Sequence, residues 1–145
     1  MLLESLSAIY DEYLSAVYSP ASGSSPLRGM LAALFPGRAG GWDDANRRFA
    51  ESAAALLDAF CAGSPSPSEA AAAAEYVLRA GEGRENDQAV FLMLTAMHSR
   101  LTPLVPLLPR ADAQRFAEYY DAHFPARERT PAMRRLRAAL DTRCR

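Results

Sequence analysis

The feature that most constrains the fold is the apolar segment QAVFLMLTAMHSRLTPLVPLLP at residues 88–109. A helix that is apolar around nearly its whole circumference is buried around it, so we expect residues 88–101 to form the central helix of a bundle. Pro103 and Pro106 then kink or break this helix, because proline removes a backbone donor and clashes with the preceding turn. The expected core residues of the central helix are Phe91, Leu94 and Met97.

Apolar residues recur at helical spacing along the rest of the chain, as Leu6, Tyr10, Tyr13 and Val17 do near its start. The expected helices cover residues 2–18, about 27–35, about 44–61, 69–80, 88–101, 111–124 and 131–143. No sustained alternation indicates a strand, and no segment repeats at a fixed period. The sequence therefore predicts a single all-α domain over residues 1–145, a bundle of about five to seven helices.

The ends of these helices are marked by residues with known capping or breaking behaviour. Serine, threonine and aspartate cap helix N-termini, proline suits the first helical position, and glycine suits the position after the C-cap. The residues expected at helix ends are Ser19 and Pro20, Pro36 and Gly37, Asp43 or Asp44, Ser68, Gly81, Pro125, and Thr130 with Pro131.

Composition indicates the class of protein. All 16 basic residues are arginine, and alanine is abundant, which is typical of a GC-rich and hence bacterial gene. Cys61 and Cys144 lie far apart, so we expect two free thiols in a reducing compartment. The N-terminus lacks the basic region of a signal peptide, and the run AVFLMLTAM is too short to span a bilayer. We expect a cytoplasmic protein that does not enter a membrane.

Motifs for metal binding or catalysis are not apparent. The two histidines, His98 and His123, do not stand in a Glu-x-x-His or His-x-x-x-His arrangement, so we expect no metal and no cofactor. The glycines of GRAGGW, residues 37–42, follow no expected strand and lack the Gly-Lys-Ser/Thr ending of a phosphate-binding loop. The sequence thus gives no positive sign of an enzyme.

Charge is strongly polarised along the chain. Residues 127–145 contain seven arginines and two acidic residues, a net charge of +5, whereas the whole chain carries −1 and residues 1–126 therefore carry −6. On a helical wheel Met133, Leu136 and Leu140 form an apolar stripe, and the arginines surround the remaining faces of the helix. This pattern predicts a packed terminal helix whose arginines pair with the acidic part of the chain or bind an acidic partner.

Three hypotheses for function follow. The first is a non-enzymatic protein-interaction module, an adaptor, assembly factor or inhibitor, which binds a protein partner or forms a homo-oligomer. Its candidate binding residues are Arg127, Arg129, Arg134, Arg135 and Arg137. The second, less favoured because the arginines form no single strip, is a nucleic-acid-associated subunit using the same arginines. The third is a small-molecule-binding protein or enzyme with a pocket near His98, Tyr119 and Tyr120.

Overall fold

The computed structural model describes residues 2–22, 41–83 and 88–145, and these residues contain six α-helices and no strand. The α-helices are α1 (Leu2–Ser22), α4 (Gly41–Ala62), α5 (Pro67–Arg79), α6 (Gln88–Leu101), α7 (Arg110–His123) and α8 (Pro131–Cys144). Two short 3-10 helices, η1 (Thr102–Leu107) and η2 (Ala126–Glu128), lie on either side of α7 in the chain. The predicted all-α bundle is confirmed.

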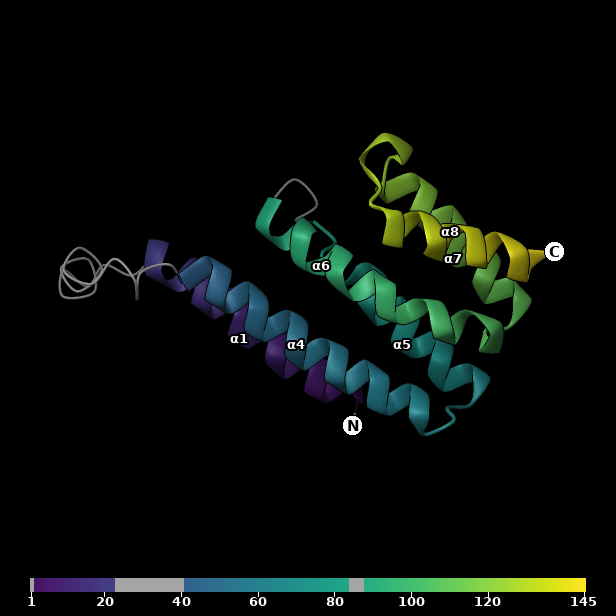
Figure 1. Cartoon of the computed structure of the whole chain (residues 1–145), viewed down its shortest axis with the longest axis horizontal. Helices are drawn as coiled ribbons and strands as arrows, with labels where there is room; N and C mark the ends of the chain where they lie inside the picture. The colour runs from purple at the N-terminus through teal and green to yellow at the C-terminus, as the bar shows by residue number, and fades with distance from the viewer. Residues whose placement is uncertain (1, 23–40, 84–87) are drawn as a thin grey trace.

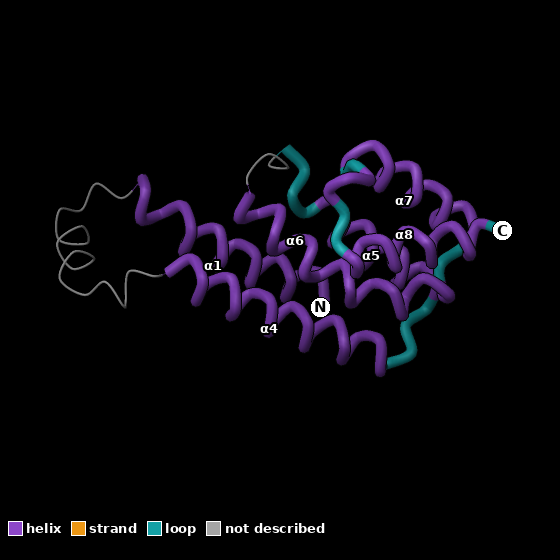
Figure 2. The backbone as a smooth tube through the Cα atoms, turned by 45° about the horizontal axis from the view of Figure 1, so that its top comes forward, coloured by secondary structure: helices purple, strands orange, loops and turns teal. Residues whose placement is uncertain are grey.

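The helices form three antiparallel hairpins side by side, α1 with α4, α5 with α6, and α7 with α8 (Figures 1 and 2). Helices α4, α6 and α8 lie in the layer nearer the viewer of Figure 1, with α1, α5 and α7 behind them. Helix α6 contacts α4 on one side, α8 on the other and α5 behind it. The prediction that α6 is the central helix is therefore confirmed.

The burial of α6 differs from the expectation in one respect. Leu94 and Met97 are buried, as predicted, and Phe91 is half-buried against the core. Leu92, however, is 48% exposed, and it forms an exposed strip with Ala96 at the next helical turn. We expected burial on most sides, and the exposed side is the outer one, because α6 lies within a layer and no described helix covers that side.

A glycine allows α5 and α6 to approach closely. Gly81 follows the C-cap residue Ala80, the position predicted from the sequence. Its φ is not in the left-handed region, so it is not required there for backbone conformation. A Cβ atom at Gly81 would instead overlap Cδ1 of Leu94. The end of the Leu94 side chain occupies the space of the missing methyl group and would have to shift to admit one.

Several helix ends differ from the sequence-based expectation. Helix α1 continues to Ser22, so Ser19 and Pro20 lie in its last turn and do not end it. Helix α4 begins at Gly41, which places Asp43 and Asp44 in its first turn and not at its N-cap. Acidic residues are favourable in a first turn, because the helix dipole is positive there. The expected helix at 27–35 lies outside the described residues.

Helix α5 starts one serine earlier than predicted. Ser66, and not Ser68, is its N-cap residue, and its Oγ accepts a hydrogen bond of 3.2 Å from the backbone nitrogen of Glu69. Pro67 then occupies the first helical position, where its missing donor has no cost. The prediction failed because both serines precede the alanine run, and Pro67 favours the earlier one.

Helix α8 begins and packs as predicted. Thr130 is its N-cap residue and accepts a hydrogen bond of 3.3 Å from the backbone nitrogen of Met133, and Pro131 follows at the first helical position. Met133, Leu136 and Leu140 are at most 1% exposed. Burial of such side chains stabilises a fold by about 1.5–3 kcal/mol each, so α8 is an integral part of the domain.

The apolar region at the centre of the chain is longer than the nine-residue run considered above. Val90–Leu107 is long and apolar enough to cross a membrane by length and composition, with a mean hydropathy of 1.3 over 18 residues. It consists of α6 and η1, and its residues Leu94, Met97 and Leu101 are buried in the core. The core helix of a globular domain has the same composition, so this finding is weak support for a membrane span.

Candidate functional site

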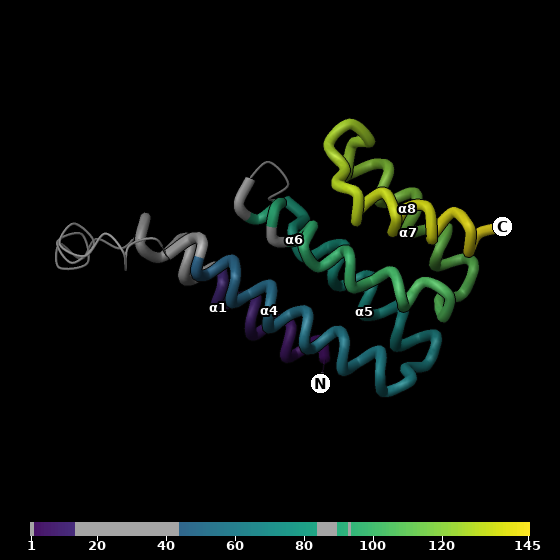
Figure 3. Tube along the Cα trace, in the orientation of Figure 1, coloured from purple at the N-terminus to yellow at the C-terminus, as the bar shows by residue number. Residues whose placement is uncertain are grey.

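A groove of about 440 Å³ lies between η1 and the C-terminal end of α8, which are adjacent in Figure 3. Its lining residues come from η1, from the first residue of α7, from the last two turns of α8 and from the residue that follows α8. They are Thr102, Val105, Pro106, Arg110, Ala139, Thr142, Arg143 and Arg145. This volume lies within the range of about 300–1,000 Å³ that is typical of ligand-binding clefts.

The two prolines after α6 create the floor of the groove. Pro103 lies at the start of η1 and Pro106 inside it, and neither can continue an α-helix. The chain therefore tightens into a 3-10 turn that buries Leu104 and Val105 and leaves Pro106 exposed. The break at these prolines was predicted, whereas the groove that results from it was not.

Three arginines line the groove, and among the described residues no aspartate or glutamate does. Arg143 is half-buried and donates a hydrogen bond of 2.7 Å from Nε to the carbonyl oxygen of Leu108, which leaves Nη1 and Nη2 without a partner among the described residues. Arg110 is exposed and has no ion pair within the described part of the chain. Arg145 pairs with Asp141 of its own helix at 2.8 Å.

The arginines chosen from the sequence are not brought together as one surface. Arg129 and Arg137 both bind Asp121 on α7, at 2.8 and 2.9 Å. The hydrogen bonds from Arg137, and then those from Arg129, lower the pKa of the Asp121 carboxyl to about 2. Arg129 also donates from Nε to the carbonyl oxygen of Phe124 at 2.8 Å, so this cluster fastens α8 to the end of α7.

The other three arginines of that set are exposed. Arg127 is 85% exposed and lies 3.8 Å from the neighbouring Glu128, a pair of little energetic weight. Arg134 and Arg135 are exposed on α8 and form no ion pair among the residues that the structure describes. The fold thus holds two of the five arginines in structural contacts and leaves three accessible to a partner.

His98 and Tyr120 form a buried pair in the core. Nδ1 of His98 lies 3.0 Å from the hydroxyl oxygen of Tyr120, and both residues are 0% exposed. Desolvation lowers the pKa of His98 to about 3, so its imidazole is neutral at neutral pH. Nε2 of His98 has no hydrogen-bond partner among the described residues. Burial likewise raises the pKa of the Tyr120 hydroxyl.

Tyr119, the third residue of the expected pocket, lies apart from this pair. Its ring stacks on that of His123 with centroids 4.1 Å apart, and the guanidinium carbon of Arg79 lies 5.4 Å from its centroid. Tyr119 lines a small cavity of about 30 Å³ between α5 and α7. None of the three cavities described here is lined by His98 or Tyr120.

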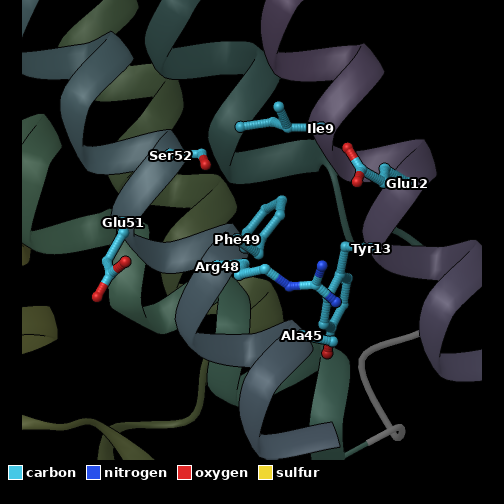
Figure 4. Close-up of a pocket in the computed structure, with 8 residues that line it drawn as sticks. All are labelled: Ile9, Glu12, Tyr13, Ala45, Arg48, Phe49, Glu51 and Ser52. Carbon is cyan, nitrogen blue, oxygen red and sulfur yellow. The ribbon is translucent and has the colours of Figure 1, made fainter. Parts of the chain in front are cut away.

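A second hollow, of about 190 Å³, lies between α1 and α4. Figure 4 shows its lining residues, which are Ile9, Glu12, Tyr13, Ala45, Arg48, Phe49, Glu51 and Ser52. The rings of Tyr13 and Phe49 pack with centroids 5.0 Å apart, and Glu51 turns away from the hollow (Figure 4). Arg48 lies 3.4 Å from Asp44, so its charge is already partly compensated. The hollow between α1 and α4 is smaller than the groove, and its arginine is already paired, so it is the weaker candidate for a ligand site.

The chemistry of the remaining polar residues does not point to a further site. Among the described residues no three His, Cys, Asp or Glu side chains gather in a way that could hold a metal ion. The thiol of Cys61 is half-buried, and its burial raises its pKa, which disfavours the reactive thiolate. The groove at η1 and α8 is therefore the strongest candidate site.

Comparison with known proteins gives no assignment: no protein-family model, no curated protein and no solved structure matches the chain.

Sequence reasoning missed the groove residues Arg110 and Arg145, and it placed Arg143 only on a solvent face. The signal that could have found them was the pair of prolines after the central helix, since a forced break beside a terminal helix leaves a surface depression. Leu108 and Arg143 are 35 residues apart, however, and their contact depends on how α8 packs.

Proposed function

We propose that the chain is a non-enzymatic protein-interaction module, an adaptor, assembly factor or inhibitor, that binds an acidic partner through its arginine-rich C-terminal region. The observation that carries this proposal is that Arg110, Arg134 and Arg135 are exposed and without an ion pair among the described residues. They belong to a molecule whose residues 1–126 carry −6 and whose residues 127–145 carry +5. Such polarity orients an acidic partner towards one end of the fold.

Catalysis has less support than binding. A general base must reach its substrate, and the one buried histidine, His98, is 0% exposed and lines none of the cavities described. A nucleophilic cysteine needs a lowered pKa, and burial raises that of Cys61. The groove, by contrast, combines an apolar floor with unpaired cations, which is a binding surface and supplies no reacting group.

Nucleic-acid binding is the alternative, and two observations weigh against it. Asp121 binds both Arg129 and Arg137, which removes two of the cations expected to contact phosphates. The acidic remainder of the molecule repels a polyanion that extends beyond the C-terminal region, whereas a short acidic segment of a protein avoids this repulsion.

The test is affinity purification of the full chain from cells of its source, with and without nuclease treatment. The wild type is compared with the triple variant Arg110→Gln, Arg134→Gln, Arg135→Gln. We expect a protein partner that resists nuclease, is released by moderate salt and is lost with the triple variant. If the partners are recovered only without nuclease treatment, the nucleic-acid alternative is favoured. Recovery of the same proteins with the triple variant would exclude the arginine surface.

A further inference from the structure

We infer that the groove between η1 and α8 binds an acidic segment that carries one large apolar side chain. The apolar side chain lies on Val105, Pro106 and Ala139, and carboxylates beside it bind Arg110 and Arg143. This inference rests on the proposed function and narrows it to one surface and one chemistry of ligand.

The floor of the groove fits an apolar anchor. Val105 is 3% exposed and is held in place by the 3-10 turn, whereas Pro106 is exposed and Ala139 half-buried beside it. Small and rigid residues leave a depression that the side chains of the fold do not fill. A leucine-sized side chain placed there removes apolar surface of both partners from water, at about 25 cal/mol per Å².

The rim fits carboxylates. The bond from Nε of Arg143 to the carbonyl oxygen of Leu108 fixes the half-buried guanidinium at the groove, while its two terminal nitrogens stay available. These two nitrogens can bind a carboxylate in a charge-assisted contact, which is stronger than a neutral hydrogen bond. Arg110 supplies a second cation to the lining, and no acidic side chain of the described residues lines the groove and competes for either.

The backbone adds to this preference for negative charge. Arg110 is the first residue of α7, and its N-cap position is held by Pro109, which makes no side-chain capping bond. Within its own first turn, α7 offers Asp112 as the one acidic residue at the positive end of its dipole. An acidic ligand at Arg110 benefits from this end of the helix as well as from the guanidinium.

A segment of a protein fits this groove better than a small molecule does. Pro106, Arg110, Thr142 and Arg145 are all exposed, so the groove is open along its rim. Small-molecule sites bury about 70–90% of their ligand, which an open groove does not achieve. A peptide compensates because its flanking residues make further contacts outside the groove.

The experiment is fluorescence polarisation with the full chain and a labelled peptide in which glutamates flank a central leucine. Two further peptides have the leucine replaced by serine, or the glutamates replaced by glutamine. We expect saturable binding of the first peptide and binding weaker by about tenfold or more for each of the others. Weaker binding of both the serine peptide and the glutamine peptide would show that the apolar anchor and the negative charge each contribute to binding.

Protein variants place the binding site. Thr142→Trp fills the groove from an exposed position of α8, and Ala138→Trp adds the same side chain to an exposed position of α8 outside the lining. We expect Thr142→Trp to weaken binding by about tenfold or more and Ala138→Trp by less than about twofold. Arg110→Gln should weaken it severalfold, whereas the double variant Arg134→Gln, Arg135→Gln should change it little. Unchanged thermal melts confirm that each variant is folded.

Several outcomes would overturn the inference. Equal binding by Thr142→Trp and Ala138→Trp would place the peptide elsewhere and would leave an acidic-partner function standing. Equal binding of the leucine and serine peptides would reduce the contact to charge alone. A DNA or RNA oligonucleotide that binds more tightly than the peptide and is sensitive to Thr142→Trp would assign the groove to nucleic acid. No peptide binding up to about 1 mM would exclude the groove as the site, and the affinity purification would then judge the function separately.

Discussion

The side chain of Leu94 lies in the space that a Cβ atom at Gly81 would need, where the end of α5 meets α6. Leu94 fills the position that any side chain at Gly81 would need, and it is itself 2% exposed. The sequence showed that a glycine stood at a helix end and that Leu94 faced inward. It could not show that the two residues touch, because the contact depends on the crossing of the helices.

Leu94→Ala should therefore lower the free energy of unfolding by about 2–5 kcal/mol, because it leaves a cavity in the core. Gly81→Ala should lower it by about 1–3 kcal/mol through overpacking. In the double variant the new methyl group occupies part of the cavity, so the combined loss should be smaller than the sum. Urea denaturation of the four proteins tests this. Strict additivity would show that the residues do not compete for space, and a loss below about 0.5 kcal/mol for Leu94→Ala would make α6 peripheral.

His98 makes stability depend on pH. Its pKa falls from 6.5 to about 3 on folding, so between these values the unfolded chain binds more protons than the folded one. Stability is then fully present above pH 6.5 and is lost as the pH falls towards 3, by at most about 1.4 kcal/mol per pH unit. The carboxyl of Asp121, with a pKa of about 2, adds a separate loss below its ordinary value of 3.8.

Urea denaturation between pH 7.5 and 4.5 isolates the histidine contribution from that of Asp121. We expect the wild type to lose stability steadily below pH 6.5 and His98→Gln to lose markedly less. If the slope in His98→Gln equals that of the wild type, His98 is not the buried group that opposes protonation.

Some helix boundaries follow local sequence signals, and others do not. Thr130 with Pro131 is a local capping signal, and α8 begins there as predicted. Pro20 is also a local signal, but α1 continues past it to Ser22, although proline lacks the backbone donor of an i→i−4 bond. The exposed Leu92 on α6 shows the limit of periodicity, which cannot tell a central helix within a layer from one that is surrounded.

Helix α8 has a buried face that stabilises the fold and an exposed face that carries Arg134 and Arg135. Leu136 is 1% exposed, so Leu136→Ala should cost about 2–5 kcal/mol in the free energy of unfolding. The exposed pair Arg134→Gln, Arg135→Gln should change it by less than about 0.5 kcal/mol. Thermal and urea melts compare the two proteins. A double glutamine variant that unfolds as readily as Leu136→Ala would mean that these arginines hold the fold together.

For the whole molecule, the sequence predicted the class of fold, the central helix and the polarity of charge, but not the candidate site. The helices could be predicted because each one has its own periodic apolar residues, as α8 has Met133, Leu136 and Leu140. The groove lies where the chain, at Pro103 and Pro106, turns beside α8, and Val105, Arg110 and Arg143 line it together. A surface assembled from three elements has no signature in any one of them.

The most direct test of the account is a map of amide chemical shifts in the full chain, recorded while the leucine-containing acidic peptide is added. We predict that shifts concentrate in η1, at the start of α7 and in the last two turns of α8, and that they disappear in the Thr142→Trp protein. Shifts concentrated instead on α1 and α4, or spread evenly over the exposed arginines, would contradict the assignment of the groove as the binding site.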